Sequence, residues 1–270
     1  MKRFPLLSTT LLVLILLFSF VGPFFYTSSA YDLNPSAILV APNSDYLFGT
    51  DRLGRDVCAR LMLGGQTSLI VGLLSAMIAS FLGLMIGISA GFFQRSVDKI
   101  IIIMIDLFLT FPTFFLLLAL ISYMSASLWV LVFIISITGW MGMARLIRSE
   151  SFAISNAPFI KILKLSEVNS FKIIFKYFAP LLAPLFFISF TFGVSGAILA
   201  ESGLSFLGIG ITPPQMSWGL ILSEGKEVID IAWWLSFFPG FFIFLVTFSL
   251  INLSDYLQAK SNEKDILNDI

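Results

Sequence analysis

The chain has 270 residues, of which 58% are hydrophobic and only 12% are charged, and its formal net charge is zero. Soluble domains carry about 25% charged residues, and one soluble core cannot bury this much apolar surface, so the composition excludes an ordinary soluble protein. The zero net charge gives no sign of nucleic-acid binding.

The sequence contains one cysteine, Cys58, and no histidine. Ser-His-Asp and Cys-His catalytic arrangements are therefore impossible, and a zinc, copper or haem site lacks its usual ligands. We predict no catalytic residue, no metal ligand and no enzyme activity for this chain.

Apolar runs recur along the whole sequence, and a membrane-spanning helix needs about 20 mostly apolar residues. The pattern predicts an all-α polytopic membrane protein with about six transmembrane helices. The fourth run is short, and the third contains an aspartate. The predicted spans are residues 4–25, 68–93, 100–123, 127–143, 180–200 and 231–253.

The first span also resembles a signal peptide, because Lys2 and Arg3 precede it and small residues at 28–30 follow it. Its apolar run exceeds the usual length of a signal core, which favours a retained helix. With the N-terminus in the cytoplasm, twelve of the sixteen Lys and Arg residues lie inside and four outside. This bias predicts that both termini are cytoplasmic.

These spans divide the chain into two predicted parts. Residues 1–67 form the N-terminal transmembrane helix and an extracytoplasmic segment, and residues 68–270 form a five-helix core. The core includes a cytoplasmic segment at 144–179 and a second outside segment at 201–230.

Three small residues and two unusual ones stand out within the spans. Gly83, Gly87 and Gly91 share one helix face and allow a neighbouring backbone to approach closely, either within the subunit, which we favour, or in a partner. Asp106 lies inside the third span, where a charge is costly, so it faces either a water-filled path or the wetted interface. Pro112 follows and predicts a kink.

The cytoplasmic segment combines basic and apolar residues at helical spacing. We expect two short amphipathic helices that meet near residues 166–170. Such helices either lie on an anionic membrane face or insert into a groove on a partner protein, and periodicity alone does not choose between these. The apolar positions are Phe159, Ile160, Leu163, Phe171, Ile174, Phe175 and Phe178.

The chain lacks a phosphate-binding loop of the Gly-x₄-Gly-Lys-Ser/Thr type. The nearest match, at Gly225 and Lys226, is followed by Glu227 where a hydroxyl residue is required. If ATP drives this protein, a partner subunit binds it.

Three longer stretches carry a family resemblance: FGTDRLGRDV at 48–57, ARLIR at 144–148, and AILAESGLSFLGIG at 197–210, which is followed by Pro213, Pro214 and SWG at 217–219. With them, nearly the whole chain resembles the inner-membrane permease subunits of ABC importers for dipeptides, oligopeptides and nickel complexes, specifically the second of the two permeases. The resemblance implies a bacterial inner-membrane location and a second permease, two cytoplasmic ATPases and an extracytoplasmic solute-binding protein as partners, in addition to membrane lipid.

The resemblance also implies that residues 158–180 couple the chain to an ATPase. The family usually carries Glu-Ala-Ala, a Gly and a Pro there, whereas this chain aligns Lys161-Ile162-Leu163, Glu167 and Pro180. Bulky residues replace small ones, so we expect a compensating groove on the ATPase, with Phe159 and Ile160 as the apolar anchor. The predicted coupling residues are Phe159, Ile160, Lys161, Leu163, Lys164, Glu167 and Phe171.

Outside the membrane, we expect a scaffold that contacts the partner permease or the binding protein, with Gly54 in a turn and local ion pairs among its charged residues. Its predicted members are Asp51, Arg52, Gly54, Arg55 and Asp56. For the translocation pathway the candidates are Asp106, Pro112 and Glu201, and Glu201 alternatively ends its helix.

The resemblance thus predicts half of a pathway for short peptides, and nickel complexes or another small solute are the alternatives within the family. A self-sufficient secondary transporter that uses Asp106 as an ion relay is a rival, although the expected inverted repeats are not evident. An intramembrane enzyme would need a convergent nucleophile and base, and this composition does not supply them.

Overall fold

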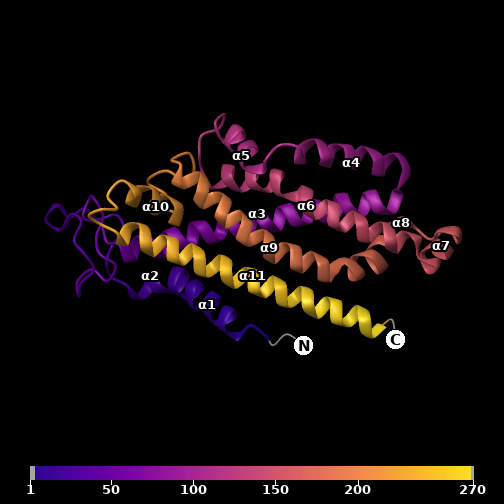
Figure 1. The fold of residues 1–270 in the computed structure, drawn as a ribbon, viewed down its shortest axis with the longest axis horizontal. Helices are drawn as coiled ribbons and strands as arrows, with labels where there is room; N and C mark the ends of the chain where they lie inside the picture. The colour runs from indigo at the N-terminus through magenta and orange to yellow at the C-terminus, as the bar shows by residue number, and fades with distance from the viewer. Residues whose placement is uncertain (1–3, 269–270) are drawn as a thin grey trace.

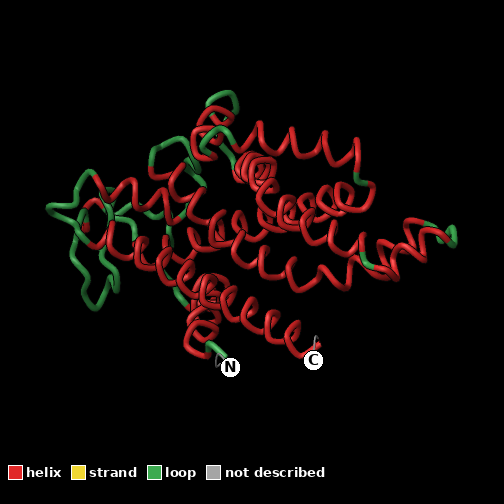
Figure 2. Tube along the Cα trace, turned by 45° about the vertical axis from the view of Figure 1, so that its right-hand side comes forward, coloured by secondary structure: helices red, strands yellow, loops and turns green. Residues whose placement is uncertain are grey.

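The computed structural model describes the backbone of residues 4–268 and the side chains up to residue 261. Its regular elements in this range are helices joined by loops (Figure 2), which confirms the predicted all-α class. Five helices are long and apolar enough to cross a membrane, and a bent pair raises the number to six if it counts as one span. Lys2 and Arg3 lie outside the described residues.

The first span is an apolar rod built from α1 (Leu6–Leu16), the π-helical turn η1 (Leu17–Val21) and α2 (Gly22–Phe25). Pro23 has no N–H, so the carbonyl of Ser19 loses its usual donor four residues on. Gln66 of the next helix supplies one instead, with its Nε2 2.8 Å from the Ser19 oxygen. The rod therefore stays continuous at its proline, as a membrane helix requires.

The second span, α3 (Val57–Phe93), is longer than predicted. Asp56 caps its first turn, since its Oδ1 accepts hydrogen bonds from the amides of Cys58 at 2.8 Å and Ala59 at 3.2 Å. Prediction placed the start at residue 68, beyond the two glycines at 64–65. They are sites of close approach: a Cβ at Gly65 would lie 2.3 Å from Ser19 Oγ. The helix thus runs through the division predicted after residue 67.

The glycine face of α3 packs against α6 (Leu128–Asn156), which confirms the favoured intrasubunit packing. A Cβ at Gly83 would lie 2.8 Å from Met143 Cβ, one at Gly87 would lie 2.7 Å from Ile147 Cβ, and one at Gly91 would lie 2.4 Å from Ser151 Cβ. The backbones of α3 and α6 therefore lie closer together than they could if these glycines carried side chains.

The predicted third span is two helices, α4 (Arg95–Leu109) and α5 (Thr113–Ile121), at 80° to each other. The kink predicted at Pro112 is confirmed, and the bend is sharp enough that the pair is either one broken span or a re-entrant loop. A residue before proline disfavours the α conformation, and Pro112 itself is extended, with ψ 123°, so α4 cannot continue into α5.

Beyond α6, the chain forms α7 (Pro158–Leu165) and α8 (Ser170–Ile173), which confirms two helices meeting near residues 166–170. The second is not separate, because α8, the π turn η3 (Ile174–Phe178) and α9 (Ala179–Phe206) form one rod. Helices α10 (Trp218–Lys226) and α11 (Trp234–Asn268) complete the fold.

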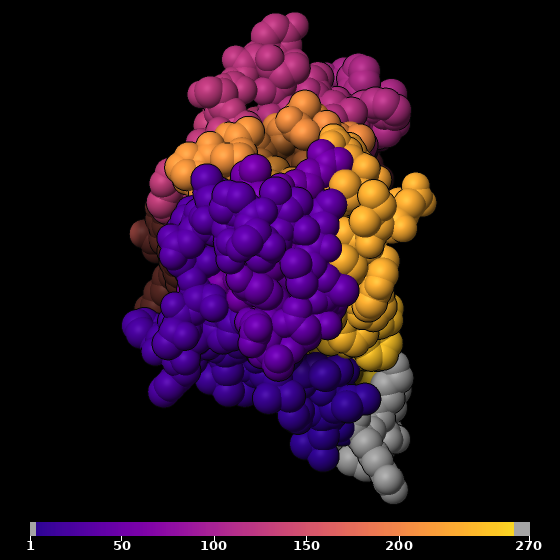
Figure 3. All heavy atoms as spheres, turned by 90° about the vertical axis from the view of Figure 1, so that its left-hand side faces the viewer, coloured from indigo at the N-terminus to yellow at the C-terminus, as the bar shows by residue number. Residues whose placement is uncertain are grey.

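The long helices run along one axis of an elongated molecule (Figure 1). Residues 27–56 and α10 lie at one extreme, which we term the loop end, and α7 and α8 lie at the other, the α7 end. Viewed from the loop end, N-terminal residues cover most of the face (Figure 3).

Candidate functional site: a central cavity and two contrasting ends

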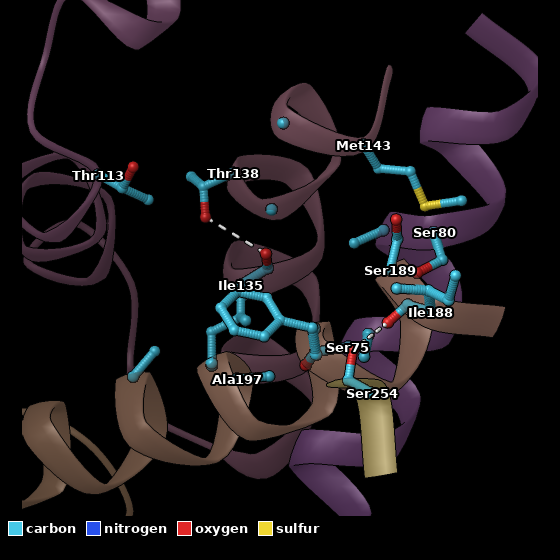
Figure 4. Close-up of a pocket in the computed structure, with 18 of the residues that line it drawn as sticks. Ser75, Ser80, Thr113, Ile135, Thr138, Met143, Ile188, Ser189, Ala197 and Ser254 are labelled. Atoms are coloured by element: carbon cyan, nitrogen blue, oxygen red, sulfur yellow. Dashed lines mark hydrogen bonds between the residues drawn. The ribbon is translucent and has the colours of Figure 1, made fainter. Parts of the chain in front are cut away.

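A cavity of about 590 Å³ lies among α3, α5, α6, α9 and α11. Small and hydroxyl-bearing residues form much of its wall (Figure 4). Its hydroxyl groups come from all five helices: Ser75, Ser80, Thr113, Thr138, Ser189 and Ser254. Among the described residues that line it, Asp255 on α11 is the one ionisable group.

The hydroxyls are compatible with a membrane interior because several donate to their own or a neighbouring helix. Thr138 Oγ1 donates to the carbonyl of Ile134 at 2.9 Å, and Ser254 Oγ donates to the carbonyl of Ile188 at 3.0 Å (Figure 4). Each oxygen keeps lone pairs that can accept another hydrogen bond. The wall is therefore mainly apolar, with scattered hydroxyl groups and almost no charge.

None of the three predicted pathway residues lines this cavity. Pro112 adjoins Thr113, which does. Asp106 on α4 forms an ion pair with Arg145 on α6, and both side chains are 56% exposed. Arg148, one turn further along α6, holds Asp98 of α4 with a bidentate contact at 2.5 and 2.8 Å. Two ion pairs thus tie α4 to the ARLIR stretch, contacts that were not predicted for Asp106.

Glu201 is fully buried and lies within α9, which continues to Phe206, so it neither ends the helix nor reaches the cavity. Its carboxylate accepts hydrogen bonds from Ser68 Oγ at 2.8 Å and Ser205 Oγ at 2.7 Å. These serines in turn accept from the amides of Trp218 and Ile211. Glu201 therefore holds α3, α9 and the loop before α10 together.

The predicted scaffold lies at the loop end and is centred on a residue that prediction overlooked. Arg60 is 1% exposed and contacts both Asp51 and Glu224 of α10, the latter at 2.5 Å. Arg55 contacts Asp51 at 2.7 Å, which is the expected local pair, and reaches Glu224 at 3.5 Å.

The other scaffold residues also hold segments of the loop end together. Arg52 pairs with Glu227 beyond α10 at 2.5 Å, and Asp56 accepts a hydrogen bond from Tyr26 at 2.8 Å while it caps α3. Gly54 has φ +72°, as expected for a turn, and a Cβ there would lie 1.9 Å from the carbonyl oxygen of Asn34. The arginines of this end thus pair with glutamates far away in the sequence, whereas only local pairs had been expected.

At the α7 end, the predicted coupling residues divide between two faces. Ile160 is fully buried in an apolar cluster with residues of α3, α6 and α9, so its assignment as an outward anchor is wrong. Leu163 packs partly against the same cluster. Lys164 and Lys161 are both exposed residues, but the ammonium of Lys164 turns back to bond to Phe92 and Ser155.

This end also exposes large apolar side chains, which we group under the name α7 outer face. It consists of Phe159, Ile162, Leu165, Phe171 and Phe175. Three of these residues, Ile162, Leu165 and Phe175, were not among the predicted coupling residues, and Leu165 is the most exposed of the five at 84%. Helical periodicity found seven apolar residues of this segment but missed Ile162 and Leu165, and it could not say which residues face inward.

Glu167 joins α7 to α8 with φ +55°, in the left-handed region. Its amide donates to Lys164 O at 3.2 Å, and the next amide, Val168, donates to Leu163 O at 3.2 Å. This hydrogen-bond pattern ends a helix at a position that favours glycine. It gives a physical reason for a glycine at the aligned position in similar chains.

Comparison with known proteins agrees with this architecture. The family model described as "Binding-protein-dependent transport system inner membrane component" matches residues 83–263. The dipeptide transport system permease protein DppC of Bacillus subtilis is 34% identical over 267 residues, which cover 98% of this chain and 83% of the relative.

Two further relatives are oligopeptide transport system permease proteins named OppC. The Haemophilus influenzae protein is 30% identical and spans 96% of this chain and 84% of its own length. The Bacillus subtilis protein is 28% identical and spans 97% and 86%. The family consists of transport permeases rather than enzymes. This chain is a multi-pass membrane protein that belongs to the family of binding-protein-dependent transport system inner membrane components.

Proposed function

We propose that this permease subunit forms one half of the translocation pathway for short peptides in an ATP-driven importer. The observation that carries the proposal is the cavity of about 590 Å³ at the centre of the helices, a volume within the range typical of small-molecule sites. Its wall offers hydroxyl groups and almost no charge. Such a wall suits cargo whose backbone is constant and whose side chains vary, because it does not select strongly for one side chain.

The α7 outer face is the proposed docking surface for a cytoplasmic ATPase. Five apolar side chains exposed together, Leu165 among them, fit a helix that inserts into a partner's groove. Lys161 adds a positive charge beside them. The bias of Lys and Arg toward this end supports its placement in the cytoplasm.

The remaining partners follow from the same proposal. A second permease completes the pathway, two ATPase subunits bind and hydrolyse ATP, and an extracytoplasmic solute-binding protein delivers cargo to the loop end. The assembly lies in the bacterial inner membrane. This chain contributes the pathway wall and the docking surface, while ATP is bound by the partner.

The test is to co-express the permease with the products of its neighbouring genes and to purify through a C-terminal tag. We expect an ATPase to be recovered with wild type, and Leu165→Asp or Phe159→Asp to reduce its recovery. Leu47→Asp, a matched change at an exposed leucine of the loop end, should have no effect. If wild type recovers no ATPase, the docking proposal fails.

The cargo is tested with the assembled complex in proteoliposomes that contain the binding protein. We expect ATP-dependent uptake of labelled di- and tripeptides. Uptake of a nickel complex but not of peptides would replace the proposed cargo. Uptake driven by an ion gradient through the purified chain alone would instead establish a secondary transporter.

A further inference from the structure

The ammonium of Lys164 makes three contacts at the junction of two other helices. Its Nζ donates to the carbonyl of Phe92 at 3.1 Å and to Ser155 Oγ at 2.7 Å, and it lies 4.2 Å from the centre of the Phe92 ring. Phe92 belongs to the last turn of α3, and Ser155 belongs to the last turn of α6. One side chain of α7 thus contacts the ends of both helices that pack through the glycine face.

The end of α3 explains why a cation binds there. The last four carbonyls of a helix lack intrahelical partners, and Gln94 and Arg95 leave the helical path with φ of 54° and 47°. The Phe92 oxygen is one of these carbonyls, and a positive charge at a helix C-terminus is favourable. The partial burial of Lys164 lowers its pKa, so the ammonium has exchanged part of its water for these contacts.

Helix α3 extends from this junction to the cavity. It is one continuous helix from Val57 to Phe93, and Ser75, Ala76, Ala79 and Ser80 at its middle form part of the cavity wall. Its glycine face fixes it against α6. A displacement applied at Phe92 therefore reaches the wall as a rigid-body movement of packed helices.

We propose that Lys164 is a positioning residue that ties α7 to α3, so that displacement of α7 by a bound ATPase moves the α3 wall of the cavity. The inference rests on the proposed function for the existence of that ATPase. It assigns the ammonium of Lys164 to contacts within the subunit rather than to the docking surface, where Ile162 and Leu165 of α7 lie.

The test compares Lys164→Met with Lys164→Arg in the assembled transporter, reconstituted in proteoliposomes. ATPase recovery, ATP hydrolysis and peptide uptake are measured on the same preparations. We expect Lys164→Met to keep its ATPase but to transport at least about fivefold less peptide per ATP hydrolysed, the low end of typical coupling between sites. Lys164→Arg retains a cation and donors and should keep most of the wild-type ratio.

A wild-type ratio in Lys164→Met overturns the inference, and so does loss of the ATPase from that variant, which would make Lys164 a docking residue. Both outcomes leave the proposed function intact. Absence of ATP-dependent uptake by wild type is different, because it removes the proposed function itself.

A second measurement needs only the permease. Spin labels at Leu165→Cys on α7 and Met77→Cys on α3, both exposed positions, report the distance between the two helices. The residue Lys164 as a whole is exposed, so replacing it leaves the apolar core intact. We expect Lys164→Met to broaden the distance distribution and Lys164→Arg to preserve it. An unchanged distance distribution in Lys164→Met overturns the proposal that Lys164 ties α7 to α3.

Discussion

Buried charges join distant segments at the loop end, whereas an apolar cluster does so at the α7 end. At the loop end, Arg60 pairs with both Asp51 and Glu224 inside the subunit. At the α7 end, Ile160 is enclosed by its own subunit while Leu165 remains exposed.

The amino-acid composition of the loop end or of the α7 end does not by itself show which residues are used inside the subunit and which remain exposed. The loop end carries the charged motif yet uses much of that charge internally, because ions removed from water must be paired. The α7 end carries the conspicuous cations, but its exposed side is apolar and one lysine is used inside.

The largest effect should come from Arg60→Met at the loop end. Removing this guanidinium leaves Asp51 buried with its charge only partly compensated, and breaking such a pair costs about 3–5 kcal/mol. We expect a large fall in the unfolding temperature of the detergent-solubilised protein. The exposed pair of Arg52 and Glu227 supplies the control, since Arg52→Met should cost about 0–1 kcal/mol. Equal losses in the two variants would contradict a buried network.

At the α7 end the matching change is Ile160→Ala, which removes a fully buried side chain and leaves a cavity. The expected loss of unfolding free energy is about 2–5 kcal/mol. Leu165→Ala should change stability by less than about 0.5 kcal/mol, because that side chain is exposed. Unfolding temperatures in the same detergent measure both. A more harmful Leu165→Ala would show that the two faces of α7 have been assigned in reverse.

Between the ends, Gly87→Ala should separate α3 from α6. The added methyl would lie 2.7 Å from Ile147 Cβ and 2.8 Å from the carbonyl of Ala144, and overpacking costs about 1–3 kcal/mol. At Gly142 nothing lies within 4 Å of such a methyl, so Gly142→Ala should be neutral or stabilising. Thermal unfolding of the two variants provides the comparison, which fails if Gly87→Ala is equally well tolerated.

The smallest effect is a gain from Glu167→Gly. A non-glycine residue in the left-handed region costs about 1–2 kcal/mol, and Glu167 has φ +55°. We expect slower amide hydrogen exchange across residues 158–178 and a slightly higher unfolding temperature. Lys161→Gly, inside α7, should instead lose about 1 kcal/mol. Faster exchange in Glu167→Gly would rule out strain at this position.

The sequence alone was sufficient for the properties that depend on local composition. Apolar runs identified the spans, because lipid excludes unpaired backbone polar groups, and Pro112 identified the break after α4 because proline acts on its immediate neighbours. Long motifs placed the chain in its family. The amphipathic pattern at 158–178 identified its helices as well, since periodicity reads one helix at a time.

Only the tertiary structure decided which partners those residues meet. Arg60 reaches Glu224 across 164 positions, and the cavity hydroxyls of Ser75 and Ser254 come from helices far apart in the chain. Small and hydroxyl-bearing residues have no distinctive spacing in the sequence, so no pattern predicted that they line a cavity. The rotation of α7 about its axis decides that the ammonium of Lys164 reaches back to α3 and α6 while Leu165 points outward. Packing against α3, α6 and α9 fixes this rotation. The local sequence of α7 does not specify it.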